Sequence, residues 1–423
     1  MPDAMTACYY LSPRFVAVSG DTAPVIAPAT LVQVGQRAVV SPDEAEVVLA
    51  QVNAAQKAWA ATDAKTRAKH LHDLANRIEA MDMTRCATLM SREMGKPYPE
   101  AIGEVANCAP VFRYYAEMAR DEAGKLAGTT QAGSLQYARY EPYGVSAHIM
   151  PFNFPILLMC WTVAASLAAG NCCVVKPAEA TTLSTLEFMQ VFDGLPEGLV
   201  ACLPGDAGLG QALVESERTH AIAFTGSVAA GRAVAAAAGA RMKPAVIEAG
   251  GSDPMIITDH APLEVAAAGA VTGAFHLSGQ VCTSTERMYV TDAVHDAFVA
   301  AFVAETRRLR IGNGLGKTEI GPLVSKAARD KVERLVTDAV AKGAKVACGG
   351  QVPPDQNSGW FYEPTILTDC HPDMDLLNEE IFGPVVGICR VPDFDTALRM
   401  ANDSSFGLGA SIFTTDLAEA HEA

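Results

Sequence analysis

The sequence predicts an α/β protein with parallel sheets that are covered by helices on both faces. From Tyr143 to about Gly250, short apolar strand candidates alternate with helical segments, which is typical of a parallel sheet between two helical layers. A second alternating set begins at Pro254 and continues to the strand candidate LGASIFTTD. The chain has 423 residues, half of them apolar, which is enough for two or three domains with their own cores.

The first third of the chain is predicted to be largely helical. Residues 41–44 (SPDE) form a capping box with proline at the first helical position, and they predict a helix that runs to about Ala60. Helical patterns follow at 66–81, at 84–94 and from Pro99 to Leu126. The next segment, 128–140, is polar and punctuated by glycine, and its alternation in SLQYARY predicts a β-hairpin.

Strand and helix candidates then follow in regular order. In the first set we expect strands at VSAHIM, NCCVVK, LVACLP, AIAFTG and AVIEAG, with helices near 156–169, 182–192, 207–215 and 227–239. In the second set we expect strands at MIIT and RMYVTD, helices at 262–278, 293–308 and 325–342, and further strands to IFTT. The apolar run from Ile149 to Gly170 contains Pro151 and Pro155 near its start, so we predict a strand, a turn and a buried helix rather than a membrane span.

Composition excludes several classes of function. The net charge of −16 argues against a nucleic-acid partner, because phosphate binding needs basic clusters. The eleven cysteines are spaced neither as a disulfide framework nor as zinc ligands, so we expect no metal site and mostly buried, reduced thiols in a cytoplasmic protein. The first ten residues, MPDAMTACYY, lack the basic and apolar regions of a signal peptide.

Two segments at predicted strand ends carry groups that suit a dinucleotide. In FTGS, Gly226 permits a tight turn and Ser227 opens a helix whose free N–H groups can hold a pyrophosphate, although a simple helix cap explains Ser227 equally well. In VVKPAE, Lys176 can reach ribose or phosphate and Glu179 can accept ribose hydroxyls, since ligands of open α/β sheets bind at the carboxyl ends of strands. Taken alone, Lys176 could equally be a surface lysine.

Cys282 is the candidate nucleophile. It follows a Gly-Gln pair at the end of a predicted helix, and its small neighbours would allow a substrate to approach the thiol. The alternative is a buried structural cysteine. A cysteine protease would need a paired histidine, and His276 lies too few residues away on the same predicted helix to be the usual partner.

Glu248 and Asn153 are the candidate base and oxyanion donor. Glu248 ends a predicted strand between Ile247 and Ala249, and such apolar surroundings would raise the pKa of its carboxyl group and make it a base. The alternative is a surface or salt-bridged glutamate. Asn153 stands between prolines and aromatic residues in MPFNFP, where its amide could donate to a developing oxyanion or simply serve a turn.

These segments occur together in an order that identifies a family. With PFNFP, AGNCCVVKPAE, FTGS, IEAGG, GQVC, IGPLVS and EEIFGPV, the chain resembles the aldehyde dehydrogenase superfamily from about Val40 to its last residue. The resemblance implies a Rossmann-type NAD-binding domain at 1–250 with an oligomerisation hairpin at about 128–142. It further implies an α/β catalytic domain at 251–410, followed by the truncated start of a C-terminal segment at 411–423.

The resemblance also implies a reaction: NAD(P)-dependent oxidation of an aldehyde to a carboxylic acid through a cysteine thiohemiacetal and thioester. The implied catalytic roles are nucleophile for Cys282, base for Glu248, and oxyanion hole for Asn153 and the Cys282 N–H. In the implied cofactor site, Lys176 and Glu179 hold the adenosine ribose, and Ser227 after Gly226 holds the pyrophosphate. Glu380 and Phe382 hold the nicotinamide ribose and ring. We expect NAD to be preferred and NADP to be possible, because the negative charge of Glu179 would repel a 2′-phosphate.

Within the superfamily, four segments are most similar to those of succinate-semialdehyde dehydrogenases: MGKPYPEA, RYYAEMA, GGSDP and ANDSSFGLGASIFTTD. Betaine-aldehyde or broad-range members share many of these segments. A CoA-acylating dehydrogenase is a further alternative, against which Glu248 argues. Ala249 replaces the usual leucine, and family members usually continue beyond Ala423. We therefore expect the family's homo-oligomer to be weakened, and an impaired fragment with an assembly role is the last alternative.

Overall fold

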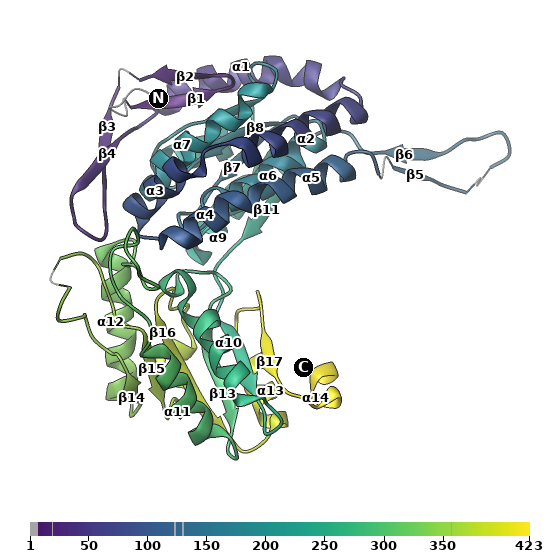
Figure 1. The fold of residues 1–423 in the computed structure, drawn as a ribbon. Helices are drawn as coiled ribbons and strands as arrows, with labels where there is room; N and C mark the ends of the chain where they lie inside the picture. The colour runs from purple at the N-terminus through teal and green to yellow at the C-terminus, as the bar shows by residue number, and fades with distance from the viewer. Residues whose placement is uncertain (1–6, 19, 122–123, 129–130, 357) are drawn as a thin grey trace. The chain divides into compact units, whose positions relative to one another are not determined.

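The computed structural model describes residues 7–18, 20–121, 124–128, 131–356 and 358–423. The chain divides into two compact units, which are shown in Figure 1. Unit 1 comprises Met1–Ile26, Gln33–Glu93 and Ala101–Glu248, and unit 2 comprises Ala27–Val32, Met94–Glu100 and Ala249–Ala423. Each unit is built on its own mostly parallel sheet with helices against it, which confirms the predicted α/β class.

The sheet of unit 1 has seven strands in the order β11–β10–β7–β8–β9–β1–β2. The first five are parallel to one another, while β1 pairs antiparallel with β9 and with β2. Their bounds are β1 Cys8–Leu11, β2 Arg14–Ala17, β7 Val145–Ile149, β8 Cys172–Lys176, β9 Val200–Cys202, β10 Ala221–Thr225 and β11 Ala245–Glu248. The central strand β8 is buried along its whole length, as expected for a strand covered on both faces.

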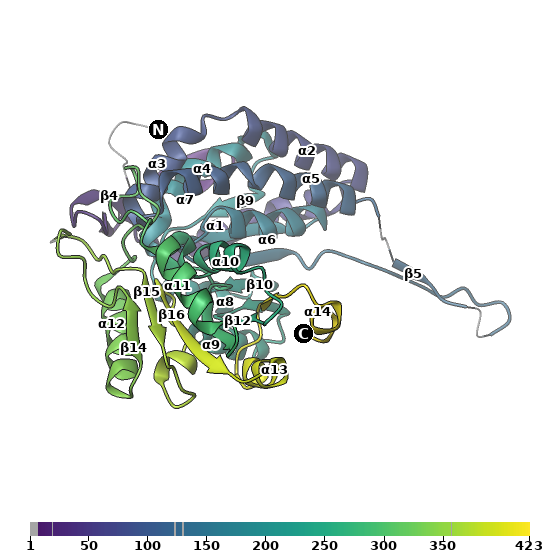
Figure 2. The same cartoon turned by 60° about the horizontal axis from the view of Figure 1, so that its bottom comes forward.

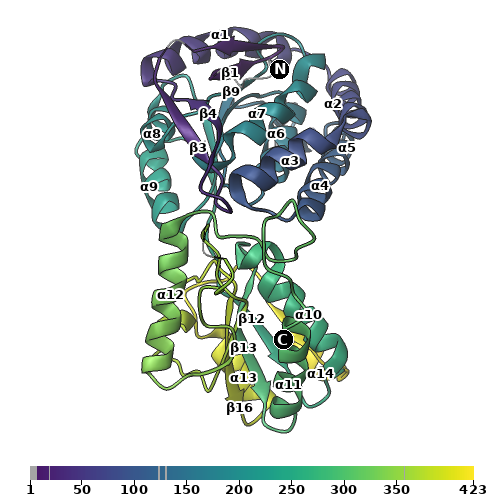
Figure 3. The same cartoon turned by 60° about the vertical axis from the view of Figure 1, so that its left-hand side comes forward.

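Helices cover both faces of this sheet. On one side lie α1, α8 and α9, and on the other lies α6, with α2 and α5 side by side beyond it (Figures 2 and 3). The helices that lie wholly or mainly in this unit are α1 Pro42–Ala60, α2 Ala64–Ala80, α3 Met83–Met94, α4 Tyr98–Ala106, α5 Cys108–Met118, α6 Leu157–Ala168, α7 Thr182–Phe188, α8 Ala207–Glu215 and α9 Val228–Gly239, with 3-10 turns η1 Glu179–Thr181 and η2 Met189–Gly194. The predicted capping box is present at α1, where Ser41 and Glu44 exchange hydrogen bonds.

Two hairpins complete unit 1. Strands β3 (Thr22–Ile26) and β4 (Gln33–Ala38) pair antiparallel and contact η1 and α7. Strands β5 (Gly124–Leu126) and β6 (Tyr137–Arg139) form an arm that extends away from the helices of unit 1 (Figure 1). The arm was predicted at 128–140, but its first strand begins earlier, and residues 129 and 130 of that prediction lie outside the described residues.

Unit 2 contains a six-stranded sheet in the order β14–β15–β16–β13–β12–β17. All neighbours are parallel except β14 and β15. The bounds are β12 Asp253–Ile257, β13 Thr285–Thr291, β14 Lys345–Cys348, β15 Thr365–Thr368, β16 Val385–Val391 and β17 Ser411–Phe413, and the helices are α10 Leu263–Phe275, α11 His295–Thr306, α12 Lys326–Ala341, α13 Phe394–Asn402 and α14 Leu417–Glu422, with 3-10 turns η3 His276–Gly279 and η4 Asp375–Leu377.

The alternation of side chains along these strands creates two cores. Met288 and Val290 of β13 face a core that includes residues of α10 and α11, whereas Tyr289 between them faces a core that includes residues of α12 and α13. Figure 3 shows α12 on one side of the sheet and α10 and α11 on the other. Because successive strand residues point to opposite faces, the apolar run Met288–Val290 supplies side chains to both cores.

Two predictions for the first third of the chain are wrong. The first third was predicted to be largely helical and no strand was predicted before Ser41, yet β1 to β4 lie there. The helix predicted from Pro99 to Leu126 is instead two helices, α4 and α5, and the chain is extended again at β5. Pro110 lies in the first turn of α5, where a missing N–H costs little, so this proline marks a helix start that the pattern did not reveal.

The apolar stretch after Val145 has the predicted strand, turn and helix in β7 and α6. Among the described residues, the search for a helix with the length and apolar character of a bilayer span found none. All eleven cysteines are free thiols.

Candidate active site

Unit 1 gathers four of the predicted site segments at one edge of its sheet. In the parallel register, Ile149 of β7 lies between Lys176 of β8 and Phe224 of β10, and Thr225 lies beside Glu248 of β11. The strands therefore end together, and the residues that follow them share the carboxyl edge where open α/β sheets bind ligands. Lys176 and Glu248 end their strands, Asn153 follows β7, and Ser227 follows β10.

The start of α9 presents backbone donors to solvent. Ser227 is its N-cap, and its hydroxyl accepts a hydrogen bond from the Ala230 N–H at 3.3 Å. Ser227, Ala229 and Ala230 are exposed. The other N–H groups of the first turn have no acceptor within the helix, so their chemistry fits the diphosphate of a dinucleotide.

Lys176 and Glu179 occupy the neighbouring strand end and the turn η1. Lys176 is buried, and its Nζ donates to the Pro177 carbonyl oxygen at 2.9 Å. Burial lowers the pKa of Lys176, and the nearby charge of Glu179 opposes that shift. Glu179 is itself paired with Arg37 of β4 at 2.7 Å. Arg37 lies outside every motif described above, so it was not predicted as a site residue.

The loop after β7 holds Asn153 in a fixed environment. Asn153 is only 3% exposed, and its Oδ1 accepts a hydrogen bond from the Phe154 N–H at 3.1 Å. Directly beyond, buried Glu104 of α4 accepts from the N–H groups of Ile156 and Leu157 through Oε1, at 2.9 and 3.1 Å. Glu104 thus fixes the start of α6 and the end of the Asn153 loop, a role that the sequence analysis missed.

Glu248 differs from its predicted environment. Its backbone carbonyl accepts from the Gly226 N–H at 3.1 Å, which ties β11 to the turn before Ser227. Its side chain is exposed, so the apolar surroundings predicted for the carboxylate are wrong. The prediction failed because Ile247 and Ala249 are neighbours only in sequence; alternate residues of a strand point to opposite faces.

Unit 2 places Cys282 at the amino end of its sheet, just before β13. The chain arrives through η3, where Leu277 and Ser278 both have positive φ, of 50° and 57°. Buried Gln280 fixes this bend: its Nε2 donates to the Leu277 carbonyl at 3.3 Å, and its Oε1 accepts from the Val324 N–H at 2.9 Å. The Cys282 side chain is half-buried, so its thiol is partly accessible.

The protonation of Cys282 follows from its surroundings. Burial raises the pKa of the thiol, the N–H groups of Cys282 and Thr283 oppose that shift, and the charges of Asp253 and Glu380 add to it. The thiol of the free enzyme therefore needs a base, or a bound ligand, to become a nucleophile near neutral pH.

The paired glycines of IEAGG allow close approach. The N–H of Gly251 donates to Glu380 Oε1 at 3.2 Å. A Cβ atom at Gly250 would collide with the Glu380 carboxylate, and one at Gly251 would collide with the Cys282 carbonyl oxygen. Glycine at both positions therefore leaves room for Glu380 and Cys282 to contact the same short segment, Gly250–Gly251.

Glu286 holds the loop that carries Phe382. It lies on β13, it is buried, and its two carboxylate oxygens accept from the N–H groups of Ile381 and Phe382, both at 2.7 Å. Phe382 has φ of 52°, a conformation that a bulky residue adopts only when its surroundings enforce it. Burial raises the pKa of Glu286 to about 8. The available signal was its place in the sequence, because Glu286 directly precedes the predicted strand RMYVTD.

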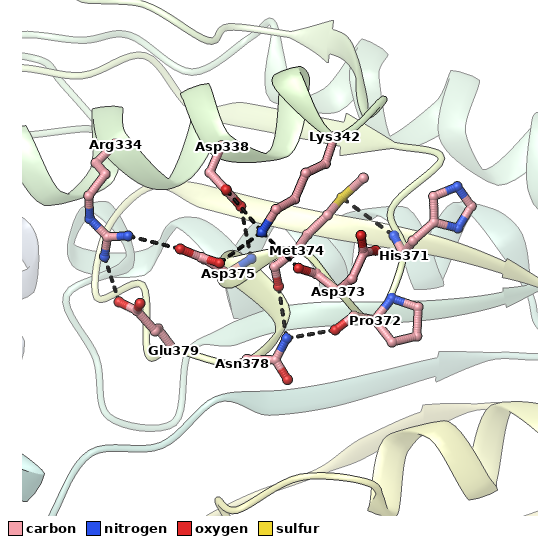
Figure 4. A network of polar contacts seen from close by, with 10 residues as sticks. All are labelled: Arg334, Asp338, Lys342, His371, Pro372, Asp373, Met374, Asp375, Asn378 and Glu379. Atoms are coloured by element: carbon pink, nitrogen blue, oxygen red, sulfur yellow. Dashed lines mark hydrogen bonds and ion pairs between the residues drawn. The ribbon is translucent and has the colours of Figure 1, made fainter.

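A polar network anchors the segment that precedes Glu380. Figure 4 shows Arg334 of α12 reaching both Asp375 and Glu379, while Lys342 binds Asp338 and Asp375. The same lysine donates to the Asp373 carbonyl at 2.8 Å. Helix α12 thereby fixes the approach to the Glu380–Phe382 loop. In the described part of the chain, no cluster of three or more His, Cys, Asp and Glu side chains is placed to hold a metal ion.

Comparison with known proteins decides the family. The family model for the "Aldehyde dehydrogenase family" matches residues 15–423. The chain belongs to the aldehyde dehydrogenase family. It is 36% identical over 422 residues to a betaine aldehyde dehydrogenase of Brucella anthropi, covering 98% of this chain and 86% of that protein.

Solved structures of aldehyde dehydrogenases agree with this assignment. Lactaldehyde dehydrogenase from Escherichia coli superposes with a TM-score of 0.95 at 33% identity, covering 99% of this chain and 88% of that one. PnpE in complex with nicotinamide adenine dinucleotide superposes with a TM-score of 0.95 at 35% identity, covering 99% and 87%. The predicted family and its fold are confirmed, and the chain is an NAD(P)-dependent aldehyde oxidoreductase.

Proposed function

We propose that this aldehyde dehydrogenase oxidises its substrate to a carboxylic acid through a thioester on Cys282. The observation that carries the proposal is the setting of Cys282. Its side chain is half-buried just after the kinked turn η3, and its carbonyl oxygen and the Glu380 carboxylate both lie against the paired glycines. A structural thiol would be expected inside a core, as are eight of the other ten cysteines.

In the proposed reaction, the Cys282 thiol gives its proton to solvent water, and its sulfur bonds to the aldehyde carbon. The resulting oxyanion accepts hydrogen bonds from the Asn153 amide and the Cys282 N–H, donors that stabilise charge developed in the transition state. A bound nicotinamide would accept the hydride that this carbon must lose for the oxyanion to become the thioester. Glu248 then takes a proton from water, which attacks the thioester carbon and releases the acid and the thiol. The exposure of Glu248 supports access to water.

The dinucleotide is assigned to the residues that the family resemblance indicates. We propose that Lys176 and Glu179 hold the adenosine ribose and that the turn at Gly226 and Ser227 holds the diphosphate. Glu380 and Phe382 are assigned to the nicotinamide ribose and ring. We further propose residues 1–250 as the cofactor domain and 251–410 as the catalytic domain. Residues 411–423 extend the latter through the pairing of β17 with β12.

Two aldehydes are the leading substrate candidates. Succinate semialdehyde is supported by the similarity of MGKPYPEA, GGSDP and the other segments quoted above to those of succinate-semialdehyde dehydrogenases. Betaine aldehyde is supported by the Brucella anthropi relative. It is also supported by the partly or largely exposed aromatic rings of Phe152, Phe154 and Trp161, because aromatic faces attract quaternary ammonium groups.

The decisive experiment is an aldehyde panel read by NADH absorbance, with succinate semialdehyde, betaine aldehyde and lactaldehyde, each with and without CoA. We expect acid formation without CoA, and Cys282→Ala should lose at least about 10³-fold in turnover. Cys348→Ala, at another half-buried thiol of unit 2, is the matched control and should retain activity. Turnover that depends on CoA, or that survives Cys282→Ala, would contradict the proposal.

Assembly and compartment are proposed on separate grounds. The β5–β6 arm exposes Leu126, Leu135 and Tyr137, which supports a homo-oligomer formed through the arm. The eleven free thiols support a reducing, cytoplasmic compartment.

A further inference from the structure

A polar seam, formed by Ser146, His148, Thr162 and Ser166, joins strand β7 to helix α6 in unit 1. Ser146 and His148 lie two residues apart on β7, so their side chains point to the same face, and Thr162 and Ser166 lie one turn apart on α6. His148 Nδ1 lies 2.8 Å from Thr162 Oγ1, and Ser146 Oγ lies 3.1 Å from Ser166 Oγ. The two elements are therefore linked by a pair of side-chain hydrogen bonds.

His148 is the most deeply buried member of this seam. Its side chain is inaccessible to solvent, and its second nitrogen, Nε2, lies 2.8 Å from Ser146 Oγ. Burial lowers the pKa of His148 to about 3, so the imidazole is neutral near neutral pH. A neutral imidazole has one donor and one acceptor nitrogen, and a hydroxyl partner can serve either. Because both nitrogens have such a partner, the seam specifies one position of the helix against the strand.

The seam lies at the base of the loop that carries Asn153. Loop 150–156 leaves the end of β7 and enters α6, so His148 and Thr162 stand on its two sides. Asn153 Oδ1 accepts from the Phe154 N–H, and the amide nitrogen is therefore the end that can donate to an oxyanion. Such a donor must lie about 2.7–3.1 Å from the oxyanion. A shift of α6 along β7 would move the loop and lose this distance.

We propose that His148 is a positioning residue for the oxyanion donor: through Thr162 it fixes α6 against β7 and so holds the Asn153 amide where the oxyanion forms. The inference rests on the proposed role of Asn153. The two nitrogens of His148 have different tasks. The Nδ1 contact with Thr162 spans the loop, whereas the Nε2 contact with Ser146 stays within β7 and orients the ring.

The test uses a reaction that forms an oxyanion without an aldehyde or a coenzyme. The Cys282 thiolate should attack the carbonyl carbon of 4-nitrophenyl acetate, and nitrophenolate should leave as the thioester forms. Stopped-flow absorbance of nitrophenolate gives the acylation rate, with Cys282→Ala as the background. Thr162→Val keeps the shape of the side chain and removes its hydroxyl, and it should slow acylation about tenfold. In an Asn153→Ala background it should change the rate less than about twofold, because the donor that it misplaces is gone.

Two substitutions of His148 separate the tasks of its nitrogens. An asparagine amide lies close to the place of Nδ1, and a glutamine amide lies close to the place of Nε2. His148→Asn should therefore keep most of the acylation rate, whereas His148→Gln should match the loss in Thr162→Val. The matched control is Thr272→Val on α10, which removes a hydroxyl that donates to the Ala268 carbonyl of its own helix at 3.2 Å. This variant should acylate at the wild-type rate.

The inference is wrong if Thr162→Val acylates at the wild-type rate, or if it causes equal losses with and without Asn153. It is also wrong if His148→Asn is no faster than His148→Gln. If acylation does not depend on Cys282, or if Asn153→Ala acylates as fast as wild type, the proposed oxyanion site itself is wrong and this inference falls with it. Should His148→Gln fail to fold, Thr162→Val in the two backgrounds still decides the matter.

Discussion

At the scale of single residues, the raised pKa of the half-buried Cys282 thiol predicts that the reactivity of this thiol increases with pH. Burial raises the pKa of this thiol above its ordinary value of 9.0, so the reactive thiolate increases as pH rises toward and through that raised value. We expect alkylation of Cys282 by iodoacetamide in the absence of cofactor to accelerate about tenfold per pH unit between pH 7 and 9.

Mass spectrometry of the labelled peptide measures the rate, with Cys282→Ala as the background and circular dichroism to confirm the fold at each pH. A rate that is already constant at pH 7 would mean that the thiol is ionised there, contrary to the effect of burial.

Glu248 carries a second prediction at this scale. If its exposed carboxylate activates water, Glu248→Gln should still release one equivalent of NADH per active site in a burst, and steady turnover should fall by about 10² or more. Stopped-flow absorbance separates the two phases. Glu264→Gln, an exposed glutamate in the first turn of α10, should change neither phase. A steady rate close to wild type in Glu248→Gln would remove Glu248 from this role.

Some of the site residues could be predicted from sequence motifs, whereas others could be identified only from the fold. Cys282, Lys176 and Ser227 stand in recognisable segments at the ends of strands and helices, and their positions were predictable. Arg37 and Glu104 were not, because each acts on a partner from a distant part of the chain: Arg37 is 142 residues from Glu179, and Glu104 is 52 residues from Ile156. A local sequence pattern does not indicate a contact between residues so far apart in the chain.

At the scale of elements, the loop from Glu380 to Phe382 depends on Glu286 of β13. In the unfolded chain this carboxyl ionises near 4.5, whereas burial raises its pKa to about 8 in the fold. The contribution of Glu286 to stability is therefore full below about pH 4.5 and is lost as pH rises through 8. Glutamine is close in shape to the protonated form and lacks this dependence.

We expect wild type to lose more than about 1 kcal/mol of unfolding free energy relative to Glu286→Gln between pH 5 and 9. Urea unfolding at each pH measures the difference, and Glu333→Gln, at an exposed site on α12, should follow wild type throughout. Parallel curves for wild type and Glu286→Gln would refute the shifted ionisation.

The elements themselves were predictable where local pattern and tertiary packing agree. Strands β7 to β11 and helix α8 lie at or within a few residues of their predicted places because each strand is apolar and each connection is a regular crossover. Strands β1 to β4 escaped prediction because they are short, and β1 is fixed by pairing with β9 far along the chain. Propensity alone does not reveal such a strand.

At the scale of the whole molecule, the β5–β6 arm is expected to control assembly. Leu126 and Tyr137 are 75% and 69% exposed, and burying such side chains between subunits is favourable. We expect the double variant Leu126→Glu, Tyr137→Glu to reduce the mass measured by light scattering, because it would place charges in the interface. Val47→Glu, at an exposed valine of α1, should leave the mass unchanged. A wild-type protein that is monomeric in this measurement would refute assembly through the arm.

The pairing of β1 with β9 also has a consequence for synthesis. The Ser12 hydroxyl accepts from the Val200 N–H across 188 residues of sequence. A ribosome that adds 5–20 residues per second needs on the order of 10–40 s to make that intervening chain. For this interval β1 has emerged without β9, and its edge on that side presents unpaired backbone groups, as an exposed sheet edge does. The nascent chain is thus most open to chaperones, and to wrong pairing, before Val200 appears.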